Sequence, residues 1–389
     1  MVRVGTWNVE NLFLPGGEAG PKTEDAYQQK LDALAATITD LAPDVLAVQE
    51  VGEPQALDDL AARVGGGWHV ELADPDGRGI RVGYLSRQPL TDVEQIAAFP
   101  EGLRPIQVDD TDVELSAMGR PALQARVDID GRPVYLITCH VKSKLLTYPD
   151  GRFSPRDEGE RARYAVFALN RRAAEAATVR EAATGLLDGQ GQQRAVIVLG
   201  DLNDEAAAAT TQILYGPPGS EIGTGGFDPP DQGDGQRLWN LAPLIPEEQR
   251  FTRIYRGQRQ LIDHILVSHI IVRVVPKMTS PPVTPPSHRS ATTRTTGATN
   301  PGPTTAQSSS TSGSEPPPVP GCRGWSQVWS SVPAAGAFSF TDRIPFSAPP
   351  LDVYASDVAM ISLFPAFSRN RNCPDVSVNN SNFPAIAPP

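Results

Sequence analysis

The sequence predicts an α/β protein built on mixed β-sheets, and three observations support this. Apolar runs typical of strands recur along the first 275 residues. Amphipathic helical patterns lie between some of these runs. Two runs are separated only by a turn at Asp130-Gly131, a spacing typical of an antiparallel hairpin. Strands that alternate with helices and also form hairpins indicate mixed sheets rather than a purely parallel sheet.

The predicted strands are rich in Val, Ile and Leu. They cover Val2–Trp7, Val45–Val48, Ile80–Leu85, Ala122–Ile129, Val134–Cys139, Ala195–Leu199 and Leu261–Val267. In the first predicted helix, apolar residues recur every three or four positions and therefore share one face. These residues are Tyr27, Leu31, Leu34, Ile38 and Leu41. A second, long amphipathic helix is predicted over residues 158–187, which are rich in Ala, Arg and Glu.

The chain is acidic, and this disfavours several protein classes. Its 389 residues carry 34 Lys and Arg against 45 Asp and Glu, a net charge of −11. Proteins that coat nucleic acid need a basic surface, although an acidic enzyme can cut nucleic acid when metal ions supply positive charge.

Three cysteines are too few for a disulfide framework or a cysteine-built metal site. Because no apolar run could span a bilayer and no export signal is present, we expect a cytoplasmic protein without a membrane span.

Composition changes abruptly at about residue 276 and predicts three parts. Residues 1–275 form a globular domain with 27 basic and 40 acidic residues, whereas residues 276–389 hold 20 of the 38 prolines. Residues 276–320 are a Pro/Ser/Thr-rich low-complexity linker, whose composition buries too little apolar area to become ordered. Residues 321–389 form an unassigned tail. This disordered or aberrant extension is either a small module or the product of a shifted reading frame.

Polar side chains end or follow five of the predicted strands. They are Asn8, Glu50, His140, the pair Asp201 and Asn203, and Asp263. Taken alone, Glu50 is typical of a cap, turn or ion pair, and His140 of a structural histidine. Five strand ends that deliver such groups favour a site instead, because one rim of a sheet can present them together.

Such a set suits metal-assisted hydrolysis of a phosphoester. Mg²⁺ prefers oxygen ligands and takes one or two protein carboxylates, with waters and phosphate oxygens completing its shell. Glu50 suits that role, with Asn8 as a neutral oxygen donor beside it. His140 would stabilise charge on the phosphoryl and leaving oxygens. Asp201 would orient and deprotonate the attacking water, and Asn203 would hold a phosphate oxygen.

These motifs resemble the endonuclease/exonuclease/phosphatase superfamily, whose type member is deoxyribonuclease I. The resemblance runs in order through residues 2–272 and lies in GTWNVENLF, DVLAVQEV, VYLITCHVKSK, AVIVLGDLND and QLIDHILVS. It implies a four-layer α/β sandwich, in which two mixed sheets pack face to face with helices outside. It also implies that residues 1–275 are the catalytic domain of an enzyme that uses Mg²⁺ or Mn²⁺.

The resemblance implies a role for each residue as well. Glu50 binds the metal with help from Asn8, and His140 contacts the scissile phosphate. Asp201 activates water, and Asn203 positions the phosphate. Arg120 stands where a phosphate-contacting arginine is sometimes found, although we favour a structural ion pair for it.

The last motif of the family, Ser-Asp-His, is missing. The resemblance implies that Asp263 orients the histidine of that motif. His264 follows Asp263 on a strand and should therefore face away from the site, and two prolines before His288 leave no strand to aim it. A frameshift after about residue 268 would explain both the missing motif and the change in composition. It would also remove the last strand and expose a sheet edge.

Two functional hypotheses follow. The first is a divalent-metal-dependent hydrolase of phosphodiester bonds, a nuclease or phosphodiesterase whose substrate could be DNA or RNA. The alternative is a catalytically impaired family member that binds phosphate without efficient turnover, or a phosphatase acting on phospholipid or sugar phosphates. Neither the oligomeric state nor the choice between endo- and exonuclease can be read from the sequence.

Overall fold

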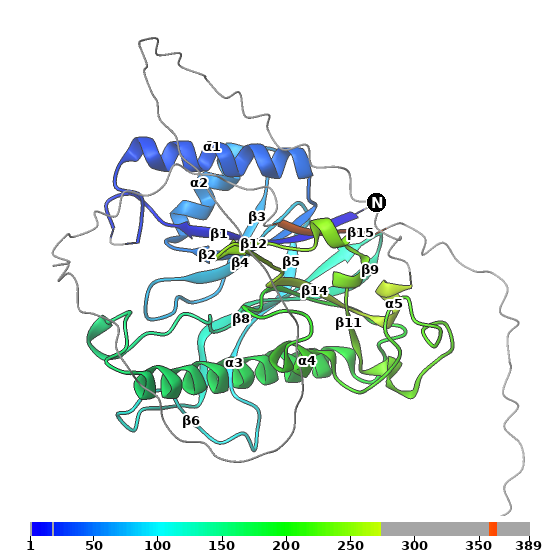
Figure 1. Ribbon diagram of the computed structural model, residues 1–389. Helices are drawn as coiled ribbons and strands as arrows, with labels where there is room; N and C mark the ends of the chain where they lie inside the picture. The colour runs from blue at the N-terminus through cyan, green and yellow to red at the C-terminus, as the bar shows by residue number, and fades with distance from the viewer. Residues whose placement is uncertain (1, 18, 274–357, 364–389) are drawn as a thin grey trace, which may run out of the picture. The chain divides into compact units, whose positions relative to one another are not determined.

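Two mixed β-sheets pack face to face in this computed structural model, and helices cover their outer faces (Figure 1). The structure describes residues 2–17, 19–273 and 358–363, all of which belong to one unit of the chain. The predicted linker at 276–320, His288 and most of the predicted tail at 321–389 lie outside these residues. The boundaries between the three predicted parts stay predictions.

The first sheet has five strands in the order β15-β1-β2-β4-β3. Strands β1 and β2 are parallel, and the other neighbours are antiparallel. The strands are β1 (Val2–Leu12), β2 (Val45–Val51), β3 (His69–Leu72), β4 (Arg81–Ser86) and β15 (Val358–Leu363).

A strand from the predicted tail occupies the edge of this sheet. β15 pairs antiparallel with β1, with Val358 opposite Trp7 and Leu363 opposite Val2. The sheet edge that a frameshift was expected to expose is therefore covered, because six apolar-rich residues far along the chain pair with β1. The apolar residues of the tail lack sustained periodicity, so no strand could be predicted there. The frameshift itself concerns the gene and stays a hypothesis.

The second sheet has six strands in the order β11-β14-β10-β9-β8-β5. Strands β9 and β10 are parallel, and the other neighbours are antiparallel. The strands are β5 (Leu90–Ala98), β8 (Ala117–Ile129), β9 (Arg132–His140), β10 (Ala195–Asp201), β11 (Leu238–Asn240) and β14 (Asp263–Ser268). Two small hairpins pair separately: β6 (Ile106–Gln107) with β7 (Glu114–Leu115), and β12 (Arg253–Tyr255) with β13 (Gln258–Gln260).

Three apolar clusters join these elements into four layers. The central cluster packs inner-facing residues of both sheets together, including Val4, Val45, Leu136 and Ile197. A second cluster joins the first sheet to α1 (Glu24–Leu41) and α2 (Pro54–Val64). A third joins the second sheet to α3 (Glu158–Leu187) and α4 (Ala209–Tyr215). The predicted four-layer α/β sandwich is confirmed.

The remaining elements are short. Helix α5 (His269–Val272) follows β14, and 3₁₀ turns lie at Pro149–Gly151, Gln232–Gly235, Ala242–Leu244 and Glu247–Gln249. The long helix predicted over residues 158–187 is α3, and Asp157 caps it by accepting a hydrogen bond from the Glu160 N–H at 2.8 Å. Within the described part of the chain, no helix combines the length and the hydropathy that a membrane crossing needs.

Gly200 lets β10 approach β9 closely at this position, and a substitution there tests that contact. Its φ is +144°, and an added Cβ would lie 2.0 Å from the carbonyl oxygen of Cys139. Gly200→Ala should therefore lower the free energy of unfolding by about 3 kcal/mol or more. Gly185→Ala is the matched control, because a Cβ in that turn of α3 would meet nothing within 4 Å. It should stabilise the protein by up to about 1 kcal/mol. Urea denaturation measures both, and equal effects would contradict the packing of β9 on β10.

Candidate active site

Strand alternation brings four of the predicted site residues to one rim of the sandwich. In β1 every second residue from Val4 faces the second sheet, and Asn8 is the last of them before the strand becomes irregular. The same alternation makes His140, Asp201 and Asp263 inner-facing residues of β9, β10 and β14. Asp201 lies opposite His140 on one side and opposite Asp263 on the other. The second sheet therefore presents three of the predicted groups side by side.

Glu50 reaches this rim through a break in regular strand geometry. Gln49 faces the second sheet, so the next residue of a regular strand would face the helices. The register of β2 shifts between Gln49 and Val51, and Glu50 has a φ of +62°. This bulge turns the carboxylate of Glu50 to the rim. There its Oε1 accepts a hydrogen bond from Asn8 Nδ2 and its Oε2 from the Asn11 N–H, each at 3.1 Å.

Asn8 joins the two sheets at the site. Its Nδ2 also donates to Asp201 Oδ2 at 3.0 Å, so one amide group contacts a carboxylate from each sheet. Its Oδ1 accepts from the Glu10 N–H at 3.0 Å, which fixes the amide orientation. His140 Nε2 lies 3.5 Å from Asp201 Oδ2 and 3.9 Å from Glu50 Oε1. We call these four residues, Asn8, Glu50, His140 and Asp201, the rim cluster.

Asn203 and Asp263 border the rim cluster. The Asn203 N–H donates to Asp201 Oδ1 at 2.8 Å, and its Nδ2 donates to the carbonyl oxygen of Val141 at 3.1 Å. Asp263 is buried, and its N–H donates to Thr252 Oγ1 at 3.3 Å. The structure thus places both beside the cluster, while their contacts with a substrate stay predictions.

His264 faces away from the rim, as its position next to Asp263 predicts. Its Nε2 lies 2.9 Å from the carbonyl oxygen of Asp204 and therefore carries the ring proton. Its Nδ1 accepts from Asn240 Nδ2 at 3.0 Å. Burial lowers its pKa to about 4. A neutral histidine with both ring nitrogens bonded inside the protein has no atom left for a substrate.

Burial controls the charge of Asp201. The pKa of this carboxyl is raised from 3.8 to about 6, mainly by burial and to a smaller extent by the nearby charge of Glu50. Hydrogen bonds from Asn8 and Asn203 act in the opposite direction, because they stabilise the carboxylate. Asp201 is therefore ionised at neutral pH but holds its proton far more strongly than an exposed aspartate.

His140 is neutral and lies among positive charges. Burial lowers its pKa well below 6.5, and the charges of Arg120, Arg78 and Lys142 lower it further. Arg120 donates to the carbonyl oxygen of His140 at 3.0 Å and forms an ion pair with Asp76 at 2.7 Å. The structural ion pair expected for Arg120 is therefore present, and its charge still acts on the rim.

The donor set at the rim is suited to a hard divalent cation. Glu50 keeps 22% of its side chain exposed, so a solvated ion can reach it. In the residues that the structure describes, no group of three or more His, Cys, Asp or Glu side chains could hold a metal ion by itself. Mg²⁺ needs no such group, because waters and phosphate oxygens supply most of its ligands. Glu50 and the amide oxygen of Asn8 could hold such an ion.

Sequence reasoning missed one charged group near the rim. The positive charge of Arg253, on the β12–β13 hairpin, lowers the pKa of Asp201. A signal for it was present, because arginine recurs every third residue at 250, 253, 256 and 259.

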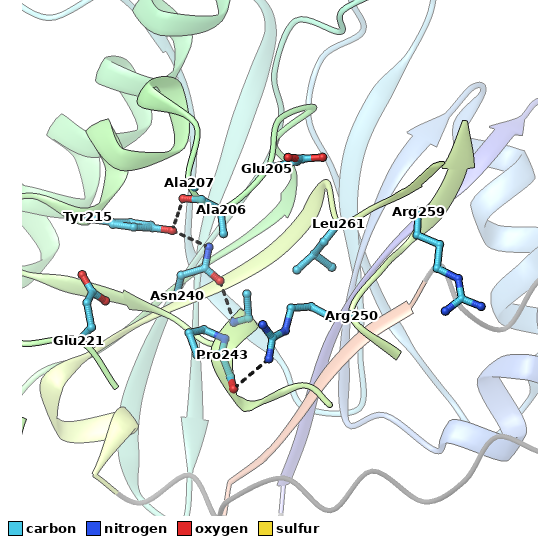
Figure 2. A pocket seen from close by; sticks show the side chains of 11 residues that line it. Glu205, Ala206, Ala207, Tyr215, Glu221, Asn240, Pro243, Arg250, Arg259 and Leu261 are labelled. Atoms are coloured by element: carbon cyan, nitrogen blue, oxygen red, sulfur yellow. Dashed lines mark hydrogen bonds between the residues drawn. The ribbon is translucent and has the colours of Figure 1, made fainter. Parts of the chain in front are cut away.

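A pocket of about 370 Å³ lies next to Arg259 of the same hairpin (Figure 2). Arg250 and Arg259 line it, together with Tyr215 and Asn240. Both arginines donate hydrogen bonds to backbone carbonyls of the 243–248 loop. Asn240 Nδ2 donates to the Tyr215 hydroxyl at 3.1 Å. The polar groups of this pocket are thus held by the protein itself.

Comparisons with known proteins found one family model and several solved structures. A family model described as the Endonuclease/Exonuclease/phosphatase family matches residues 5–305. Truncated Caenorhabditis elegans TDP2 is 14% identical over 69% of this chain and 84% of that chain, with a TM-score of 0.38. The human Nocturnin catalytic domain with bound sulfate is 17% identical over 69% and 83%, with a TM-score of 0.39. A Bacteroides thetaiotaomicron endonuclease/exonuclease/phosphatase family protein is 14% identical over 69% and 83%, with a TM-score of 0.43. No curated protein has a significant match.

The raised pKa of Asp201 predicts how stability changes with pH in the metal-free protein. Between pH 3.8 and about 6 the folded state binds this proton more strongly than the unfolded state, so the contribution of Asp201 to stability falls as the pH rises through this range. Asp201→Asn removes the titration. The free energy of unfolding of the variant, relative to the native protein, should therefore increase by up to about 3 kcal/mol from about pH 4 to about pH 7. Denaturant unfolding in EDTA measures it, and a difference independent of pH would refute the raised pKa.

Proposed function

The chain belongs to the endonuclease/exonuclease/phosphatase family, and we propose that it hydrolyses phosphodiester bonds with Mg²⁺ or Mn²⁺. Members of this family are hydrolases that act on phosphoester bonds. The observation that supports the proposal is the rim cluster, in which neighbouring side chains from both sheets lie 3.0–3.9 Å apart. The cluster offers a partly exposed carboxylate, a buried carboxylate with a raised pKa and a neutral imidazole, which are the groups that metal-assisted hydrolysis needs.

Glu50 and Asn8 would hold the metal ion. Bound there, the ion would supply positive charge against the phosphoryl oxygens of the substrate. Asn8 already directs its Nδ2 to both carboxylates, so its Oδ1 is the atom available to a cation. That oxygen also accepts a hydrogen bond from the Glu10 N–H, and its second lone pair remains for a cation.

Asp201 is suited to orient and deprotonate the attacking water. It is ionised above its pKa of about 6, and a base with a pKa near the working pH accepts a proton effectively. Asn8 bonds one carboxylate oxygen and Asn203 the other, so the group is held in one orientation while lone pairs on both oxygens stay available. Asn203 would contact a phosphate oxygen beside it.

His140 would donate a hydrogen bond to the scissile phosphate. In the described part of the chain its buried Nδ1 has no hydrogen-bond partner, so the ring proton belongs on Nε2, which faces the two carboxylates. A phosphate oxygen arriving there would accept that proton in a hydrogen bond. The charges of Arg78, Arg120 and Lys142 around this imidazole would draw the anionic group in.

A catalytically impaired protein is the second candidate, and one observation favours it. The sequence contains no Ser-Asp-His, because Ser356-Asp357 is followed by Val358. Of the other described histidines, His69 lies opposite Ser86, at the end of β4 away from the rim. His264 bonds inside the protein, and His269 lies 3.4 Å from Asp234. Turnover would then be slow, since loss of one group from a set that acts together commonly costs several orders of magnitude. Phospholipid or sugar phosphates are the alternative substrates.

Cleavage assays test the proposal. The protein should cleave a phosphodiester, supercoiled plasmid or a nitrophenyl diester, with Mg²⁺ or Mn²⁺ but not in EDTA. Glu50→Gln and Asp201→Asn should each lower kcat/KM by at least about 100-fold, because each removes a group that acts in the transition state. Glu94→Gln, which neutralises an exposed carboxylate of β5, is the matched control and should leave kcat/KM unchanged.

Two outcomes would decide against the proposal. A folded protein that cleaves no diester with either metal would favour the impaired candidate. Full activity of the Glu50→Gln variant would show that Glu50 does not hold the metal ion.

A further inference from the structure

We propose that the β12–β13 hairpin binds single-stranded nucleic acid next to the rim cluster. The inference deepens the proposed function, and rests on it for the reaction, by naming the class of substrate. Four features of the hairpin support it: its turn, the orientation of its faces, an exposed aromatic ring and its local charge.

The hairpin carries an arginine at its tip, where the backbone disfavours one. A two-residue turn, Arg256-Gly257, joins the strands, with φ values of +50° and +78°. Such turns favour Asn or Asp at the first position and Gly at the second. Arg256 is exposed there, so packing does not account for its presence.

The two faces of the hairpin have different surroundings. Arg253 lies opposite Gln260 in the register and donates to its Oε1 at 2.9 Å, so both are on one face. Thr252, the residue before Arg253, accepts a hydrogen bond at its Oγ1 from the Asp263 N–H at 3.3 Å, and Asp263 lies opposite Asp201, so the base of the hairpin lies beside the rim cluster. The charge of Arg253 acts on Asp201 from this face. Arg259 is on the other face and lines the pocket of Figure 2. The hairpin thus stands beside the site, with Arg253 on the site-facing side.

Tyr255 gives the site-facing side an exposed aromatic ring. It alternates with Ile254 along β12, so it shares the face of Arg253, and it is 49% exposed. The guanidinium carbons of Arg253 and Arg256 lie 5.3 Å and 5.2 Å from the centre of this ring. A half-exposed aromatic ring with two cations near it is suited to an unpaired base stacked on the ring and to backbone phosphates bound by the arginines.

The local charge of the hairpin differs from that of the whole chain. Residues 250–260 carry four arginines and no acidic residue, whereas the chain has a net charge of −11. An acidic protein with one basic segment attracts a polyanion to that segment. A sugar phosphate or a lipid headgroup would match the charge but offers no base to the ring. A single strand of nucleic acid matches both.

Three variants separate these contributions. Tyr255→Leu removes the ring and keeps an apolar side chain. Arg256→Asn removes the charge and suits the turn better than the native residue. Arg132→Gln is the matched control, because it also removes one arginine next to a turn. Arg132 begins β9 and His140 ends it, so the two residues are about 26 Å apart at the usual rise per residue of a strand.

Fluorescence anisotropy in EDTA measures binding of short oligothymidylate, oligouridylate and an abasic strand of equal length. Tyr255→Leu should weaken binding of both base-containing strands by about tenfold or more and leave the abasic strand unaffected. Arg256→Asn should weaken the binding of all three strands severalfold, whereas Arg132→Gln should leave the binding of each strand unchanged. The DNA and RNA arms identify which polymer binds more tightly, and unfolding midpoints check that each variant is folded.

Unchanged binding of both base-containing strands by Tyr255→Leu would overturn the inference. So would an equal loss in Arg132→Gln and Arg256→Asn. The titration does not depend on turnover, so its outcome is distinct from that of the cleavage assay. A protein that binds through the hairpin but cleaves no diester would refute the proposed function alone.

Discussion

The side chain of Gln49 connects the two sheets, and the geometry of the rim depends on it. The residue is fully buried, and its Nε2 donates to Thr6 Oγ1 and Thr138 Oγ1, each at 3.0 Å. One amide therefore joins β1, β2 and β9. A buried amide without partners costs about 1–3 kcal/mol, so the sheets cannot slide past one another without losing this free energy. The relative register of the two sheets is fixed just beneath the rim cluster.

The rim residues Asn8, Glu50 and His140 each come one or two positions after one of the three bonded residues Thr6, Gln49 and Thr138. Asn8 comes two residues after Thr6, and His140 comes two residues after Thr138, so alternation places them on the same face. Glu50 follows Gln49 directly and reaches the rim by its bulge. The polar core of the sandwich and the site are thus continuous, because the bonds that fix the sheets also position the side chains beyond them.

Much of this arrangement could be predicted from the sequence. Strand periodicity predicted mixed sheets, and the resemblance to the family implied the four layers. The positions of Asn8, His140 and Asp201 at the ends of strands predicted that they share a rim. The direction of the Glu50 side chain could not be predicted. In a regular strand it would point toward the helices, and the positive φ of Glu50 turns it toward the rim instead. Strand β15 was also missed, since its pairing with β1 joins distant parts of the chain. The recurring arginines were visible in the sequence, but the proximity of Arg253 to Asp201 depends on the fold.

A crystal structure of the protein with Mn²⁺ tests the central claim, that this rim is a divalent-metal site, most directly. Anomalous scattering locates the ion independently of any activity. We expect a peak beside the Glu50 carboxylate and the Asn8 amide oxygen, with the connection through Gln49 intact. An intact rim without a peak at saturating Mn²⁺, or a peak only elsewhere, would contradict the claim.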